Sequence, residues 1–340
     1  MNPRLSVVVP AHNAGPDLSE CLRALLASDL PRAEWELLVV DDGSSDDTAD
    51  RAARIADSVI RTPGPPRGPA AARNRGATHA SAPVVAFIDA DVEVHPDALG
   101  RMLAALDSDP ALSAVFGSYD DDPLATGIVS QYRNLLHHFV HQRNAGSVES
   151  FWAGCGAVRK SALMEAGKFD EVRYRRPEME DVELGYRLRD AGRRIALDPA
   201  ILCTHRKRWT LSGMIRSDFS RRGVPWTRLL LERHMLLAPE GLSMGDGERW
   251  SVVLAGVTVV LVVAALICRS VALAAAPIVT VAMFAAVNRA FFSWLRRARG
   301  AWFAAAAVIL HLVYNLVAVS AVLWSAVLHS LSSHSRTSVL

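Results

Sequence analysis

The chain has 340 residues, a length that fits about two domains, and its charge is divided unevenly. Residues 1–205 carry 22 Lys and Arg against 30 Asp and Glu, a balance of −8, whereas residues 206–340 carry 15 against 5, a balance of +10. No Asp or Glu follows Glu248, and Ala, Val and Leu dominate residues 250–331. These features exclude a purely soluble protein. A nucleic-acid partner is disfavoured because the basic excess lies beside the apolar runs and not on the globular half.

The four cysteines show no spacing that would bind zinc or build a disulfide framework, so we expect a reducing compartment. The apolar run at residues 5–9 ends at Pro10 and is too short for the core of a signal peptide. We therefore expect the globular half to stay in the cytoplasm.

The first ninety residues alternate between strand and helix patterns. Strands are predicted at 5–9, 36–40, 58–61 and 83–88, and helices at 17–27, 46–56 and 69–80. This alternation predicts βαβ units on a mainly parallel sheet, an α/β fold. In such sheets ligands bind beyond the carboxyl ends of the strands. Three of the predicted ends carry polar residues, namely His12-Asn13, Asp41-Asp42 and Asp89-Ala90-Asp91.

The alternation becomes less regular over residues 112–205. We predict strands at 112–119, 194–197 and 201–204, and helices at 124–142, 161–166 and 179–191, with a segment of small residues at 152–157. The first domain is predicted to end at residue 205.

The remaining chain reads as a membrane anchor. Residues 206–248 are predicted to form an amphipathic juxtamembrane segment, because 206–233 interleaves eight basic and two acidic residues with apolar ones. Apolar runs at 251–268, 271–292 and 302–328 predict about three transmembrane helices within 249–330. The sequence does not decide whether the first two runs form a hairpin that spans the membrane twice, because Arg269-Ser270 leaves only a very tight turn between them. Arg296, Arg297 and Arg299 place the next loop in the cytoplasm by the positive-inside rule, which predicts a multi-pass protein of the cell membrane.

Carboxylates gather after the strand predicted at 83–88. Asp89 and Asp91 follow it directly, and Glu93 lies two residues further. Such hard oxygen ligands hold Mg²⁺ or Mn²⁺, which neutralises a diphosphate. The alternative is a solvated acidic turn. His205, just past a predicted strand, is a further metal ligand, a diphosphate contact or a surface histidine.

Several segments in chain order resemble the signatures of the family 2 glycosyltransferases, which have the GT-A fold. They are residues 7–13 (VVVPAHN), 39–48 (VVDDGSSDDT), 72–76 (ARNRG), 87–91 (FIDAD), 154–163 (GCGAVRKSAL), 167–171 (GKFDE) and 180–184 (EDVEL). The resemblance covers about residues 5–209. It implies a GT-A nucleotide-sugar-binding domain with glycosyltransferase activity.

The resemblance also implies roles for individual residues. The nucleoside would be held by Pro10, Ala11, Asn13, Asp41 and Asp42, the base or diphosphate side of the donor by Arg73, and the ribose and metal by Asp89 and Asp91. Gly154, Cys155 and Gly156 belong to the acceptor-side segment, and Glu180, Arg208 and Trp209 are further predicted substrate contacts. The predicted metal ligands, for Mg²⁺ or Mn²⁺, are Asp89, Asp91, Glu93 and His205.

Asp181 is the general base that the resemblance implies. A carboxylate there would take the proton of an acceptor hydroxyl as its oxygen attacks the anomeric carbon opposite the leaving nucleoside diphosphate, which inverts the configuration. Glu180 and Glu183 compete for this role, and Asp181 is alternatively a first-turn residue favoured by the helix dipole. Asp41 and Asp42 are alternatively helix caps, and Arg73 a plain helix-start residue.

These features predict an inverting, metal-dependent glycosyltransferase that uses a nucleotide-sugar donor and a lipid or lipid-linked acceptor at the cytoplasmic membrane face. One alternative is a polysaccharide synthase, although His205 stands where the Q-x-x-R-W pattern of processive synthases has Gln. Another is a non-catalytic, nucleotide-sugar-binding membrane protein. A dinucleotide-dependent oxidoreductase is disfavoured because no G-x-G-x-x-G follows the first strand.

Overall fold

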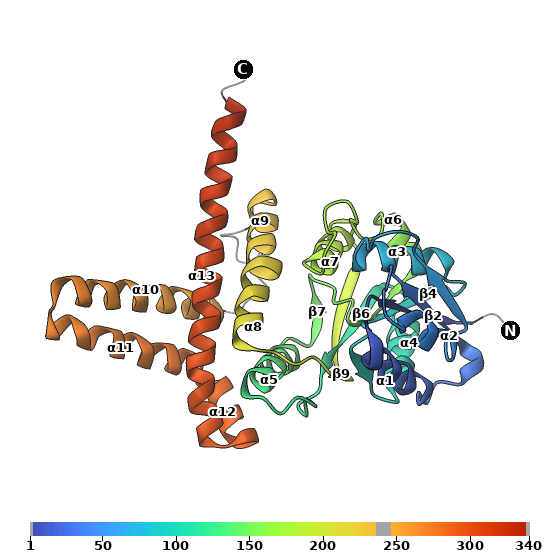
Figure 1. The fold of residues 1–340 in the computed structure, drawn as a ribbon, viewed down its shortest axis with the longest axis horizontal. Coiled ribbons are helices and arrows are strands. Elements are labelled where there is room, and N and C mark those ends of the chain that lie inside the picture. Colours follow the sequence, from blue (N-terminus) through green and yellow to red (C-terminus); the bar gives the residue numbers. More distant parts are fainter. Residues whose placement is uncertain (1–2, 236–245, 338–340) are drawn as a thin grey trace. The chain divides into compact units, whose positions relative to one another are not determined.

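A computed structural model describes residues 3–235 and 246–337. The chain divides into two compact units, Met1–Arg208 and Trp209–Leu340 (Figure 1). The first unit holds all the strands of the described chain. Residues 236–245, which belong to the predicted juxtamembrane segment, lie outside the described residues.

The first unit is built on one nine-stranded sheet in the order β3-β2-β1-β4-β8-β6-β9-β5, with β7 beside β9. The strands are β1 (Leu5–Ala11), β2 (Trp35–Asp41), β3 (Ser58–Arg61), β4 (Val84–Ile88), β5 (Val92–Val94), β6 (Leu112–Tyr119), β7 (Gly146–Val148), β8 (Cys155–Arg159) and β9 (Arg194–His205). The four N-terminal strands β3, β2, β1 and β4 are parallel, as predicted. β8 then pairs antiparallel with both β4 and β6, so the whole sheet is mixed and not mainly parallel.

Helices cover the sheet and bury its aliphatic side chains. They are α1 (Gly15–Leu26), α2 (Thr48–Ala53), α3 (Pro69–His79), α4 (Ala98–Ser108), α5 (Ile128–Arg143), α6 (Lys160–Glu165) and α7 (Glu180–Asp190). α1 buries Leu18, Leu22 and Leu25, which recur at helical spacing, in the core. α3 lies so close to β1 that a Cβ on Gly76 would meet Val8 Cγ1 at 2.3 Å.

Three features of this unit differ from the sequence prediction. The short strand β5 and the helix α4 were not predicted. The small-residue segment at 152–157 runs into the strand β8, which was not predicted. Gly156 lies in this strand and has no room for a side chain between Phe116, Phe151 and the Trp152 carbonyl. β9 runs as one strand through Pro199, with an irregular register against β6, where two strands were predicted.

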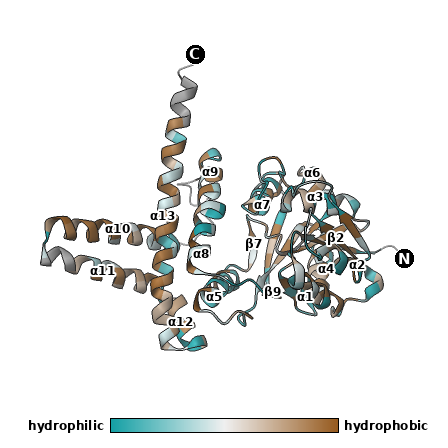
Figure 2. Cartoon of the chain, in the orientation of Figure 1, coloured by the Kyte–Doolittle hydropathy of each residue, from teal (hydrophilic) through white to brown (hydrophobic). Residues whose placement is uncertain are grey.

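The second unit is helical. α8 (Leu211–Ser217), the π-helix η2 (Asp218–Gly223) and α9 (Val224–Glu232) follow one another directly. They are followed by α10 (Asp246–Cys268), α11 (Val271–Val287), α12 (Arg289–Arg299) and α13 (Ala301–Thr337). α8, η2 and α9 pack along α13, where a Cβ on Gly223 would meet that of Ala321 at 2.6 Å. Figure 2 shows that apolar residues dominate α10, α11 and much of α13.

Two stretches of the described chain, Gly247–Cys268 and Ala301–Leu331, are long and apolar enough to cross a membrane. Ala275–Val287 and Arg289–Arg299 add a third candidate only as one broken span, because they meet at a bend of 74°. The run predicted at 271–292 is therefore not one helix. α10 and α11 pack side by side as a hairpin, and Arg269 makes its tight turn with a left-handed φ of 48°.

Candidate functional site

The carboxyl ends of β1 and β2 are joined by polar loops. Asn13, which follows β1 with a left-handed φ of 48°, receives a hydrogen bond from the backbone N–H of Ser45 (2.8 Å) and donates its own N–H to Ser44 Oγ (2.9 Å). Asp41 accepts the N–H of Ser44 at 3.1 Å. Ala11 closes the same junction, because its carbonyl accepts the N–H of Asp42 at 2.8 Å. The predicted nucleoside residues of these two strands therefore share one edge of the sheet.

Asp42 is the residue at this edge with unused hydrogen-bonding capacity. One of its oxygens, Oδ2, accepts the backbone N–H groups of Arg67 (2.9 Å) and Gly68 (2.7 Å). The other, Oδ1, is buried and has no hydrogen-bond partner in the described chain. Buried acceptors are rarely left unpaired without a functional reason. Asp42 therefore presents an oxygen suited to an N–H donor of a ligand.

Arg73 holds two carboxylates together. It is 4% exposed on α3, and its guanidinium donates to Asp89 Oδ1 at 2.7 Å and to Glu180 Oε1 at 2.8 Å. These contacts join the end of β4 to the start of α7. Both terminal nitrogens thus bind the protein, so Arg73 acts as a link within the site, and its predicted contact with the donor stays a prediction.

Asp91 lies beside His205. The two side chains approach to 3.5 Å between Oδ2 and Nε2. Burial alone would raise the pKa of Asp91, but the hydrogen bond and charge of His205, together with Lys207, bring that pKa below its ordinary value. Asp91 is therefore ionised at neutral pH, as a metal ligand must be.

Glu93 is engaged elsewhere. Arg206 forms ion pairs with both Glu93 and Asp17, and its backbone N–H donates to the Asp91 carbonyl at 3.0 Å. In the described parts of the chain, no group of three His, Cys, Asp or Glu side chains is arranged to hold a metal ion. Of the four predicted metal ligands, the structure brings Asp91 and His205 together as a pair, Asp89 is held by Arg73 and Glu93 by Arg206.

Three carboxylates begin α7, and their partners differ. Glu180 pairs with Arg73, and Glu183 pairs with Arg187 at 2.8 Å. Asp181, by contrast, accepts the backbone N–H groups of Ala153 (3.1 Å) and Val182 (2.8 Å). Burial and the adjacent Glu180 carboxylate raise the pKa of Asp181 to about 6, against the opposing effect of Arg73. A carboxylate with such a pKa is a stronger base than an ordinary aspartate.

Glycines set the backbone around Asp181. A Cβ on Gly185 would lie 2.4 Å from the Phe151 nitrogen, so α7 rests directly on the segment that carries Ala153. A Cβ on Gly154 would lie 2.5 Å from the indole nitrogen of Trp152. The Gly154 carbonyl also accepts the backbone N–H of Asp89 at 3.0 Å. The predicted acceptor-side segment therefore contacts both the end of β4 and the start of α7.

The other predicted site residues occupy simpler positions. Pro10 and Ala11 end β1, and Cys155 is buried in β8 opposite Ile88. Arg208 is exposed at the end of the first unit, and Trp209 begins the second. Their substrate contacts stay predictions.

Two residues outside the predicted set also shape the site. Asn74, next to Arg73, exchanges hydrogen bonds with the backbone of Phe169 at 2.9 Å in both directions. Tyr119, at the end of β6, stacks on His205 with ring centroids 4.6 Å apart. The A-R-N motif was a signal for Asn74, whereas nothing in the sequence around Tyr119 indicated its contact.

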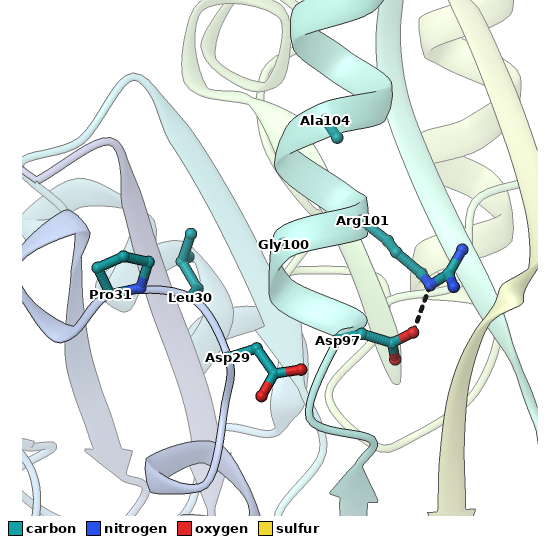
Figure 3. A pocket seen from close by; sticks show the side chains of 7 residues that line it. All are labelled: Asp29, Leu30, Pro31, Asp97, Gly100, Arg101 and Ala104. Atoms are coloured by element: carbon teal, nitrogen blue, oxygen red, sulfur yellow. Dashed lines mark hydrogen bonds and ion pairs between the residues drawn. The ribbon is translucent and has the colours of Figure 1, made fainter.

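A pocket of about 340 Å³ lies away from these residues, between the loop at residues 29–31 and α4 (Figure 3). Asp97 and Arg101, which line it, pair with each other at 2.6 Å. None of the predicted site residues lines this pocket.

We compared the chain with known protein families, curated proteins and solved structures. Residues 6–167 match the family described as Glycosyl transferase family 2. Among curated proteins, the chain is 26% identical over 176 residues to the glycosyltransferase AglE of Haloferax volcanii. The aligned region covers 49% of this chain and 56% of AglE. It is 27% identical over 218 residues to the poly-beta-1,6-N-acetyl-D-glucosamine synthase of Staphylococcus aureus, covering 62% of this chain and 52% of that protein. The matches thus span about half the length of these relatives.

Solved structures show the same fold. The mannosyltransferase PcManGT from Pyrobaculum calidifontis, in complex with GDP-Man and Mn²⁺, superposes with a TM-score of 0.59 at 22% identity, covering 93% of this chain and 88% of that one. GalNAc-T7 with UDP, GalNAc and Mn²⁺ gives a TM-score of 0.51 at 17% identity, covering 72% and 52%. Residues 6–167 therefore resemble the Glycosyl transferase family 2, and the chain has the GT-A type of fold.

Proposed function

We propose that this protein is a membrane-bound, inverting glycosyltransferase that moves a sugar from a nucleoside-diphosphate sugar to a lipid or lipid-linked acceptor. The observation that carries the proposal is the link made by Arg73. It holds Asp89, on the predicted donor side, and Glu180, next to the predicted base, at 2.7 and 2.8 Å. A transferase needs its donor and its base at such a fixed separation, because rate depends on the alignment of the reacting groups.

Asp42 supports a nucleoside ligand. Its buried Oδ1 lacks a partner in the described chain, and a pyrimidine or purine ring N–H would satisfy it. The two solved structures named above hold a guanosine or a uridine nucleotide, and both bases carry such an N–H. The chemistry of Asp42 therefore fits a nucleotide-sugar donor of either kind.

Asp91 and His205 support a divalent cation. Their ligand atoms lie 3.5 Å apart, close enough to bind one ion, and Mg²⁺ or Mn²⁺ sites commonly use few protein ligands together with substrate phosphates. When bound, such an ion neutralises the diphosphate leaving group. Arg73 keeps the neighbouring Asp89 in place, so this carboxylate is positioned for the ribose or the metal without help from the ligand.

Asp181 supports the inverting chemistry. Its carboxylate has no arginine partner among the described residues, unlike Glu180 and Glu183. With a pKa of about 6 it is ionised at neutral pH and accepts the proton of an acceptor hydroxyl. The hydroxyl oxygen then attacks the anomeric carbon as the bond to the diphosphate breaks, and no covalent intermediate with the protein is needed.

The helical unit supports a membrane acceptor. α8, η2 and α9 bury Met214, Leu229 and Leu230, and their arginines Arg216, Arg221, Arg222 and Arg228 are exposed. Each such cation contributes about 1 kcal/mol of attraction to an anionic leaflet. With the arginines of α12, these cations support a catalytic unit on the cytoplasmic face, as the positive-inside rule would have it. A lipid-borne acceptor would meet the enzyme there without diffusing through solution.

The test is release of nucleoside diphosphate from a panel of nucleotide sugars by the full chain in detergent. We expect one donor to be used, with activity lost on chelation and restored by Mg²⁺ or Mn²⁺. Asp181→Asn should abolish turnover, whereas Asp190→Asn, an exposed position on the same helix, should leave it unchanged. If no donor in the panel is hydrolysed or transferred, or if both variants behave alike, the proposal fails.

The relation to a polysaccharide synthase makes chain elongation the second candidate. Mass spectrometry of the product separates the two. A single added sugar supports transfer to a lipid acceptor, and a ladder of products supports a synthase.

A further inference from the structure

Three aromatic rings form a row beside the candidate site. His205 at the end of β9 stacks face to face on Tyr119 at the end of β6, with centroids 4.6 Å apart and planes inclined by 11°. Tyr119 meets Trp152 edge to face, with centroids 4.8 Å apart. His141 on α5 lies beside this row of three, with its ring centroid 5.6 Å from that of Trp152. The three rings come from distant parts of the sequence, and the fold alone brings them together.

The row joins the two chemical ends of the site. At one end, His205 lies 3.5 Å from Asp91. At the other, Trp152 precedes Ala153, whose backbone N–H donates to Asp181 at 3.1 Å. An acceptor whose hydroxyl reaches Asp181 must therefore lie next to Trp152.

Trp152 is held in place and is partly exposed. Gly154 leaves room for its indole, which lies 2.5 Å from where a Cβ would stand. The side chain is half-buried, and no hydrogen bond in the described chain uses its indole N–H. A fixed aromatic ring with one polar N–H is the type of surface that binds an amphipathic ligand.

The charges around the row favour a neutral ligand. At the Trp152 end, Asp181 has no arginine partner among the described residues. At the other end, Asp91 is paired with His205, and Arg206, next to His205, is committed to Asp17 and Glu93. A bare phosphate placed against the Asp181 carboxylate would be repelled. A pyranose ring would instead lay its C–H face on the indole and offer hydroxyl oxygens to the N–H.

We propose that Trp152, supported by Tyr119, is the platform for a pyranose ring of the acceptor. The acceptor is then a glycan-bearing lipid that attacks the donor through a sugar hydroxyl, and not a polyprenyl phosphate that attacks through its phosphate. This inference rests on the proposed function and narrows its acceptor class.

The first test separates acceptor binding from donor chemistry. Trp152→Ala should raise the acceptor KM by about 10-fold or more, with little change in kcat, in the affinity for nucleoside diphosphate or in donor hydrolysis. Trp152→Phe keeps a flat ring and should restore most of the affinity. If Trp152→Ala leaves the acceptor KM unchanged, or if donor hydrolysis falls equally, the platform is wrong.

The second test needs no turnover. Binding of octyl pyranosides of glucose, galactose, mannose and N-acetylglucosamine, and of farnesyl phosphate, is measured by saturation-transfer NMR on the full chain loaded with UDP or GDP. We expect at least one pyranoside to bind and Trp152→Ala to remove its signal. If farnesyl phosphate alone binds, or if no pyranoside binds, the inference is overturned. Binding of UDP and GDP to the same protein is measured separately by calorimetry. If neither nucleotide binds, the proposed function fails, whereas nucleotide binding without pyranoside binding overturns only the inference about Trp152.

Discussion

Asp181→Asn separates catalysis from stability more sharply than any other single change in this site. The amide keeps the shape of the carboxylate but cannot accept a proton. A general base typically contributes about 10² to 10⁴ in rate, so kcat should fall by that range. Donor affinity should be unchanged, because Asp42 and Asp91 are untouched.

The same substitution should make the stability of the folded protein less dependent on pH. It also removes one acceptor at every pH, because the two Asp181 oxygens accept the N–H groups of Ala153 and Val182 and an amide has one oxygen. Burial and Glu180 raise the pKa of Asp181 to about 6 from an ordinary 3.8, so the folded state binds the proton more tightly than the unfolded state. The difference corresponds to about 3 kcal/mol of destabilisation in the wild type. The penalty is absent below about pH 4, where both states are protonated, grows between about pH 4 and 6, and is complete above pH 6.

The measurement is thermal unfolding of both proteins in detergent between pH 4 and 8. For a unit of this size about 3 kcal/mol corresponds to about 6 to 12 °C, so the Tm of the Asn variant relative to the wild type should rise by that amount between pH 4 and pH 7. In the wild type, kcat/KM should fall as the pH drops below about 6. The reasoning is refuted if the difference in Tm between the two proteins does not change with pH.

Three further changes address the other parts of the site. Asp91→Ala removes the charge paired with the candidate metal and should make nucleoside-diphosphate affinity insensitive to Mg²⁺ or Mn²⁺; unchanged metal dependence in calorimetry would exclude Asp91 as a ligand. Arg73→Lys replaces a guanidinium that donates to two carboxylates by one ammonium group. It leaves a buried carboxylate unpaired and should destabilise the protein by about 3 kcal/mol or more. With about 2 to 4 °C of Tm per kcal/mol, a Tm within about 2 °C of the wild type would contradict this. Gly185→Ala puts a methyl group 2.4 Å from the Phe151 nitrogen, which should push α7 outward, displace Asp181 and lower kcat. Full activity would show that the backbone around Phe151 can move without displacing Asp181.

The first half of the fold was predictable because its signals are local. Leu5–Ala11 and Val84–Ile88 are short apolar strands that end at polar residues, and helices of ordinary length separate the strands. The antiparallel half was not predictable in this way. β8 contains only five residues, and one of them, Gly156, is small because Phe116 and the Trp152 carbonyl approach it closely. Such a segment has the composition of a loop.

Residue types in the candidate site were visible in the sequence, but their partners were not. Arg73 and Glu180 are separated by 107 positions, and a motif cannot show that one neutralises the other. Glu93 has the spacing of a metal ligand from Asp91, yet Arg206 engages it across 113 positions. Spacing along the chain therefore predicts which carboxylates share a sheet edge, and only the tertiary pairing decides which of them stay available to a ligand.

The bend between α11 and α12 is set by polar side chains and not by proline. Pro277 lies inside α11 without ending it, whereas the helix stops at Asn288. The Asn288 amide donates to Ser251 Oγ at 2.8 Å and to the Phe284 carbonyl at 2.9 Å, and its oxygen lies 3.2 Å from His311 Nε2. These bonds tie the bend to α10 and α13. They favour α12 as a separate helix and not as the second half of a span.

α12 should then lie on the cytoplasmic surface, and the turn of the α10–α11 hairpin on the opposite side. Arg289, Arg296 and Arg297 are exposed on α12, and an arginine at the bilayer centre costs about 2.5 to 3.5 kcal/mol. Of the four cysteines, only Cys268, at the end of α10, is exposed. We therefore expect a membrane-impermeant maleimide to label Cys268 from the non-cytoplasmic side of sealed vesicles. Ser293→Cys, in a chain that also carries Cys268→Ser, should be labelled from the cytoplasmic side. Labelling of both positions from one side would make the hairpin re-entrant and remove α10 and α11 from the spanning helices.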